Sequence, residues 1–162
     1  MAEDRGGNET PHIERMSRMY VCREMKIGDY QKVFALWSDT EGMGLSDSDS
    51  EEEIAKYLSR NPGHSFVCEY VDRIVGTILC GHDGRRGYIY HVAVSEEHRK
   101  RGIARMLLTK ALDSLRNAGI RKCHLMVFGA NLAGREFWEH VGWQRRDDIV
   151  IYSKSIASRG QS

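Results

Sequence analysis

One segment of the sequence, Val92 to Ala111, limits the fold and the ligand of this chain more than any other. A strand-like run ends at Val94, and a loop reading His98-Arg99-Lys100-Arg101-Gly102 follows it. Apolar residues then recur at three- and four-residue spacing, which predicts an amphipathic helix that starts near Ile103. A strand, a short loop and a helix in this order indicate βαβ character in this part of the chain.

The start of this helix is a predicted anion site. The first amides of a helix lack backbone partners and carry partial positive charge, so they attract phosphate groups. Gly102 lets the backbone approach a diphosphate, and the three adjacent cations add attraction. A solvated basic run is the alternative for this loop on its own. The segment contains neither the Gly-x-Gly-x-x-Gly of dinucleotide sites nor the Gly-Lys-Ser/Thr of a P-loop.

Hydrophobic periodicity along the rest of the chain predicts a mixed α/β fold. Helices are expected after Asp29, near residues 52–59, after Gly102 and after Asn131. Strands are expected at residues 20–25, 65–70, 74–80, 88–94 and 122–127, with one or two more between Trp143 and Ser155. This order predicts a largely antiparallel first half and βαβ character in the second.

The 162 residues fit one domain with a real core. Residues 1–18 are polar and without periodicity, which predicts a flexible leader. The domain is expected at residues 19–157, and residues 158–162 are expected to form a tail.

Composition argues against several classes of partner. The formal net charge of +1 argues against attraction of nucleic acid over the whole surface, although the basic loop keeps a nucleic-acid contact as an alternative. No run approaches the roughly 18 apolar residues that span a bilayer, so no membrane partner is expected. The four cysteines form no CxxC pair and have no histidine at metal-ligand spacing. They predict free thiols in a reducing cytoplasm, and no metal site.

Three motifs together resemble the GNAT (GCN5-related N-acetyltransferase) superfamily. Arg99-x-x-Gly102-x-Ala104 is similar to the family's Arg/Gln-x-x-Gly-x-Gly/Ala signature, and the preceding run from His91 to Ser95 resembles its central strand. Asn131-Leu132-Ala133 and Phe137-Trp138-x-x-x-Gly142-Trp143 follow at the family's distance. The likeness covers about residues 20 to 156. It implies the GNAT fold, a six- to seven-stranded mixed sheet flanked by about four helices.

A shorter likeness concerns the run from Gly76 to Gly87, with Gly81-x-Asp83-Gly84 inside it. This run resembles the small bacterial YpeA-like branch of the superfamily.

The resemblance also implies a cofactor site for acetyl-CoA as acyl donor. The loop from Arg99 to Ala104 would hold the CoA diphosphate through its backbone amides, and the strand would pair with the pantetheine arm as an added strand does. The cofactor-binding residues expected are Val92, Ala93, Val94, Arg99, Lys100, Arg101, Gly102, Ile103, Ala104, Asn131 and Trp138. For Asn131 a plain helix N-cap is the alternative, and both roles are compatible.

The catalytic groups are less clearly marked in the sequence. Relatives often carry a Glu as the general base on or near the strand that here reads Tyr88-Ile89-Tyr90-His91, and this sequence has no Glu there. The candidates for the base are therefore Tyr90, His91 and Asp83. Tyr90 and His91 must face opposite sides of the sheet unless a bulge intervenes. A core tyrosine, a satisfied histidine and a loop-capping aspartate are the alternatives. Trp138 stands where many relatives carry a Tyr that protonates the leaving thiolate, and indole is not a usable acid.

By this resemblance the chain transfers an acetyl group from acetyl-CoA to a primary amine, of a small molecule or a protein, in a ternary complex. The stretch from Asp39 to Glu53 holds seven acidic residues and no basic one, and it would favour a cationic amine. A solvated acidic loop that caps the next helix is the alternative. A non-catalytic acyl-CoA sensor is the competing function, and a homodimer is left open.

Overall fold

Within residues 19–157, the sheet has five strands in the order β1-β2-β3-β4-β5. The computed structural model describes residues 19–157, so the leader and tail expected from the sequence lie outside the described residues. The chain divides after Met126 into two compact units. The elements are β1 (Tyr20–Glu24), η1 (Ile27–Asp29), α2 (Tyr30–Ser38), η2 (Asp47–Asp49), α3 (Glu51–Arg60), β2 (Phe66–Tyr70), β3 (Arg73–His82), β4 (Gly87–Val94), η3 (Glu96–His98), α4 (Ile103–Asn117) and β5 (Cys123–Leu125) in the first unit, and α5 (Leu132–His140) in the second.

The directions of the strands follow the predicted pattern. β1, β2, β3 and β4 pair antiparallel in chain order, and β5 pairs parallel to β4 after the α4 crossover. The helix signal was read correctly, because α4 begins at Ile103 and ends just before Gly119, whose φ of +81° stops it. The mixed α/β class is therefore confirmed.

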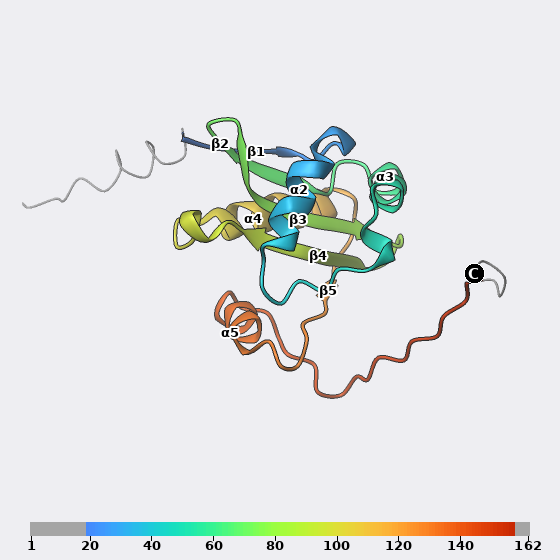
Figure 1. Ribbon diagram of the computed structural model, residues 1–162. Coiled ribbons are helices and arrows are strands. Elements are labelled where there is room, and N and C mark those ends of the chain that lie inside the picture. The colour runs from blue at the N-terminus through green and yellow to red at the C-terminus, as the bar shows by residue number, and fades with distance from the viewer. Residues whose placement is uncertain (1–18, 158–162) are drawn as a thin grey trace, which may run out of the picture. The chain divides into compact units, whose positions relative to one another are not determined.

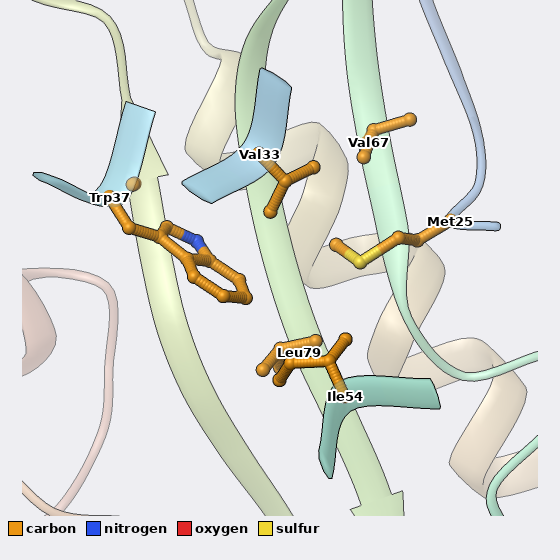
Figure 2. Close-up of a cluster of buried hydrophobic side chains, with 7 residues drawn as sticks. Met25, Val33, Trp37, Ile54, Val67 and Leu79 are labelled. Carbon is orange, nitrogen blue, oxygen red and sulfur yellow. The ribbon is translucent and has the colours of Figure 1, made fainter. Parts of the chain in front are cut away.

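Helices cover both faces of the sheet in the first unit, with α2 and α3 on one face and α4 on the other (Figure 1). On the first face, Val33 and Trp37 of α2 and Ile54 of α3 lie in one buried cluster with residues of the sheet. Figure 2 shows these side chains together with Met25, Val67 and Leu79. On the second face, a Cβ at Gly76 would lie 2.7 Å from Ile103 of α4, so the helix packs directly on the strand there.

The number of strands was overestimated from the sequence. Six or seven were expected, including one or two between Trp143 and Ser155, but residues 143–157 contain none, and β5 spans only Cys123–Leu125. Alternation of apolar residues predicts a strand only where a partner supplies the backbone hydrogen bonds. The apolar side chains from Ile149 to Ile156 are exposed, Tyr152 by 92%.

The four cysteines are free, as the sequence predicted. Cys68 and Cys80 are buried, whereas Cys22 and Cys123 are half-buried. No helix in residues 19–157 is both long and apolar enough to cross a bilayer.

An ion pair beside the sheet predicts how stability depends on pH. The Arg23 guanidinium donates to both oxygens of Asp29, at 2.8 and 2.7 Å, and this lowers the pKa of Asp29 below its ordinary value. A lowered pKa in the folded state stabilises the protein above the unfolded-state value, and the effect is lost as pH falls through the folded-state pKa. We expect Asp29→Asn to lower the free energy of unfolding by about 1 kcal/mol at pH 7. Urea unfolding at pH 7 and pH 3 should show the difference between the two proteins shrinking at pH 3; an equal difference at both would contradict the assignment.

Candidate active site

The loop before α4 has the geometry of an anion site. Gly102 is the N-cap of α4 with φ +79°, and no side chain accepts a hydrogen bond from the first turn. The first helical bond of α4 is the Met106 amide donating to Gly102 O, so the amides before it point out of the helix end. Ile103, the first residue of α4, is buried with 1% exposure.

Two of the three loop cations are tied to neighbouring groups of the protein. Arg99 Nε donates to Val94 O at 3.2 Å, and Arg101 donates to the hydroxyl of Tyr20 at 3.1 Å. The same hydroxyl lies 2.9 Å from His98 Nδ1. These bonds fasten the loop to β1 and β4, so the backbone amides have a fixed position while Lys100 stays exposed.

β4 offers an unpaired edge next to this loop. Its hydrogen-bonded register with β5 covers only Gly87, Tyr88 and Ile89. From Tyr90 to Val94 no strand among the described residues pairs with β4 on the β5 side, whereas β3 pairs on the other side as far as Val94. Ala93 is buried and its neighbours Val92 and Val94 are half-buried. An extended ligand can bind such an edge through main-chain hydrogen bonds.

A bulge in β4 brings Tyr90 and His91 to the same face. The β3–β4 register pairs Thr77 with Ala93 but Leu79 with Tyr90, which leaves one extra residue on β4. His91 takes the strained φ of +48° at this point. Its ring lies 4.8 Å from that of Trp37 in α2. Tyr90 contacts Tyr57 of α3, with 6.2 Å between ring centroids.

His91 makes one side-chain hydrogen bond, and its partner comes from the acidic stretch. His91 Nε2 lies 2.6 Å from Asp49 Oδ1, and the two side chains are 15% and 7% exposed. Thr77 Oγ1 donates to the His91 carbonyl at 3.2 Å and accepts from Trp37 Nε1 at 2.9 Å. His91 is therefore held at its backbone, at one ring nitrogen and at one ring face.

Tyr90 has the properties of a donor and not of a base. Its side chain is 37% exposed, and desolvation raises the pKa of Tyr90 above its ordinary value. At neutral pH the phenol therefore keeps its proton.

Asp83 lies in the turn between β3 and β4. Its Oδ1 accepts from the amides of Arg85 and Arg86, both at 2.8 Å, and the bond from Arg86 lowers the pKa of Asp83. The carboxylate is exposed and serves the turn, which is the capping role that the sequence left open.

In the acidic stretch from Asp39 to Glu53, the last three acidic residues lie in the first turn of α3, and one other acidic residue is buried. Ser50 caps α3 by accepting from Glu53 N at 3.3 Å, and Glu51, Glu52 and Glu53 occupy the first helical turn, where acidic groups suit the helix dipole. This is the helix-capping alternative. Asp49 is the exception, since it is buried at 5% exposure.

In the second unit, Asn131 is the N-cap of α5, and its Oδ1 accepts from Gly134 N at 3.0 Å. Trp138 packs edge-on against Phe137 and Trp143, each at 5.1 Å between ring centroids. The expected capping role of Asn131 is thus present, and its reach to a cofactor stays a prediction, as does that of Trp138.

Sequence reasoning missed Asp49, Thr77 and Tyr20 as parts of this site. Ser46 and Asp49 have capping-box spacing, which signals a cap but not a contact 42 residues away. For the other two residues the sequence carries no local signal.

Comparison with known proteins identifies the family. The model of the acetyltransferase (GNAT) family matches residues 30–143. An acetyltransferase of Photorhabdus laumondii is 34% identical over 137 residues, covering 83% of this chain and 94% of the relative. An acetyltransferase of Sodalis glossinidius is 30% identical over 134 residues, with the same two shares.

A solved structure shows the same fold. The PaiA N-acetyltransferase of Thermoplasma acidophilum, in complex with coenzyme A, matches with a TM-score of 0.68 at 18% identity, covering 79% of this chain and 91% of that one. The family model and the two relatives show that the chain belongs to the GNAT family of acetyltransferases.

Proposed function

We propose that this protein transfers the acetyl group of acetyl-CoA to a primary amine of a small molecule or a protein, directly and in a ternary complex. The observation that carries the proposal is the uncapped N-terminus of α4, fastened beside the unpaired edge of β4. One site takes a diphosphate and the other takes an extended arm. Their adjacency suits CoA better than a free anion or a nucleic acid.

In this proposal the residues from Arg99 to Ala104 bind the diphosphate through their backbone. Gly102 leaves open space there, because a Cβ on it would meet nothing within 4 Å. Val92 and Val94 pair with the pantetheine arm through their main chain, and Ala93 packs into the core beneath it. By the family resemblance, Asn131 and Trp138 are also cofactor-binding residues.

The acceptor amine must lose a proton before it attacks the thioester. For a lysine-like amine with a pKa of about 10.4, deprotonation at pH 7 costs roughly 4–5 kcal/mol. His91 accepts this proton. Its imidazole is fixed by Asp49 and by the ring of Trp37, on the face of β4 that α2 and η2 cover. The amine nitrogen then bonds to the acetyl carbon as the carbon–sulfur bond breaks.

The leaving thiolate needs little assistance. Its ordinary thiol pKa of about 8.5 makes it a tolerable leaving group. The indole N–H of Trp138 cannot supply a proton, so we assign no acid to that position. Tyr90 keeps its phenolic proton and lies on the same face of β4 as His91, so its hydroxyl can donate a hydrogen bond on that face.

Several finer statements belong to the same proposal. The YpeA-like branch remains supported only by the glycine-rich run from Gly76 to Gly87. The four free cysteines support a cytoplasmic location. The acetyltransferase domain is placed at residues 19–157, without a nucleic-acid or membrane partner, and a homodimer stays open.

A non-catalytic acyl-CoA sensor is the second candidate. The observation that favours it is Trp138, at the position where relatives carry an acid. The two functions share CoA binding and differ in turnover.

Calorimetric titration with acetyl-CoA, followed by a thiol-release assay over an amine panel, tests the proposal. We expect micromolar affinity or better, and thiol release above the buffer rate with at least one amine. Binding with release at the buffer rate across a broad panel would support the sensor instead. Absence of binding would contradict both functions and leave the basic loop as a nucleic-acid contact.

A further inference from the structure

We propose that Asp49 is the positioning residue of this active site: its carboxylate orients the His91 ring so that Nδ1 is the nitrogen that accepts the proton of the amine. The inference rests on the proposed acetyl transfer. It concerns a residue of the segment between α2 and α3, far from β4 in the sequence, and a contact that the sequence did not predict.

The hydrogen bonds of Asp49 determine which ring nitrogen carries the hydrogen. Oδ1 meets His91 Nε2 at 2.6 Å, and Oδ2 accepts from the Ser46 amide at 2.9 Å. A carboxylate that accepts on both oxygens requires a donor on the imidazole side. Nε2 therefore carries the hydrogen in the neutral ring, and the lone pair remains on Nδ1.

The second ring nitrogen of His91, Nδ1, is not fully buried. Within residues 19–157, it has no hydrogen-bond partner, and only the Tyr57 hydroxyl is a buried side-chain polar atom without one. Nδ1 therefore touches solvent, although the side chain as a whole is only 15% exposed. The nitrogen with the lone pair is thus the one that an amine can reach.

The backbone around His91 is strained in a way that serves this orientation. A φ of +48° at a histidine in a strand is strained and persists only where neighbours enforce it. Thr77 enforces it by its hydrogen bond to the His91 carbonyl, and Trp37 holds both Thr77 and the ring face. Bulges of this kind are frequent next to active sites, where they redirect a side chain.

Asp49 itself is firmly anchored. It closes the capping box of η2 with Ser46, and its carbonyl accepts from the Tyr30 hydroxyl at 2.7 Å. Tyr30 of α2 therefore fixes the backbone of Asp49, and the Ser46 amide fixes its carboxylate. Among the described residues, its carboxylate lies within 4 Å of a basic side chain only at His91.

Asp29 provides a matched control for Asp49. It is also the third residue of a 3-10 turn, and its Oδ2 also accepts from the amide of the N-cap residue, Lys26, at 2.9 Å. Its other partner is Arg23 instead of a histidine. Asp29→Asn therefore removes an equivalent structural carboxylate without touching His91.

The test compares Asp49→Asn, Asp29→Asn and His91→Gln in steady-state kinetics. An Asn whose carbonyl takes the Ser46 amide turns its NH2 toward Nε2, which forces the hydrogen onto Nδ1 and removes the base. We expect kcat of Asp49→Asn to fall at least about tenfold, as for His91→Gln. KM for acetyl-CoA and its calorimetric affinity should change by less than about threefold, and Asp29→Asn should keep its kcat. A kcat for Asp49→Asn equal to that of Asp29→Asn, with His91→Gln impaired, would overturn the inference.

Nitrogen-15 NMR of labelled histidine decides the orientation without turnover. The His91 signals, assigned by their loss in His91→Gln, should show the Nε2–H tautomer in the unsubstituted protein and the Nδ1–H tautomer in Asp49→Asn. An Nδ1–H tautomer in the unsubstituted protein would refute the role of Asp49. Missing turnover over the whole amine panel would overturn the proposed function. The tautomer measurement tests the role of Asp49 separately, because it does not depend on turnover.

Discussion

Gly102→Glu is expected to weaken acetyl-CoA binding about 100-fold. The added carboxylate would lie at the helix end where the proposed diphosphate binds. At about 5 Å and an effective dielectric constant of about 20, two unit charges repel by about 3 kcal/mol. Since each 1.4 kcal/mol is a tenfold change in affinity, this repulsion is enough for the expected loss. Calorimetric titration with acetyl-CoA measures it directly.

Gly119→Glu is the control for this substitution, because Gly119 lies beyond the opposite end of α4 in a similar backbone conformation. Gly119 has φ +81° against +79° for Gly102, and a Cβ would meet nothing within 4 Å at either position. Both variants therefore carry the same backbone strain, about 1–2 kcal/mol. We expect Gly119→Glu to bind acetyl-CoA within about threefold of the unsubstituted protein. Equal affinities of the two variants would refute the loop assignment.

The parts of this protein that the sequence predicted well are those with local causes. α4 starts at Ile103 because apolar residues repeat at helical spacing from there and Gly102 supplies the left-handed turn before it. The same segment marks the loop as an anion site without reference to the rest of the chain. Asn131 caps α5 for an equally local reason.

The parts that it predicted poorly depend on contacts between distant residues. Seven acidic residues lie between Asp39 and Glu53, and nothing in their order singles out Asp49 as the one that meets His91. The bulge that turns His91 toward it arises from the pairing of β3 with β4. The strand expected within Ile149 to Ser155 is absent for a related reason: apolar residues in the sequence do not by themselves provide a partner strand.

Trp37→Ala is expected to lower the free energy of unfolding by about 4 kcal/mol. Trp37 is fully buried in the cluster of Figure 2, and its indole donates to the buried Thr77 hydroxyl. The loss combines a large cavity with a broken hydrogen bond. A domain of this size is stable by only about 5–15 kcal/mol, so the variant should unfold at much lower urea concentration.

Two further variants separate the causes of this loss. Trp37→Phe keeps an aromatic ring and removes the N–H donor, so it should cost about 1–2 kcal/mol. Phe34→Ala changes a residue of the same helix that is 36% exposed, and should cost no more than about 1 kcal/mol. A loss for Trp37→Ala as small as that for Phe34→Ala would contradict the packing of α2 on the sheet. Because Trp37 also holds Thr77 and the ring of His91, Trp37→Phe should lower kcat while the protein remains folded, which links the stability of this cluster to the geometry of the proposed base.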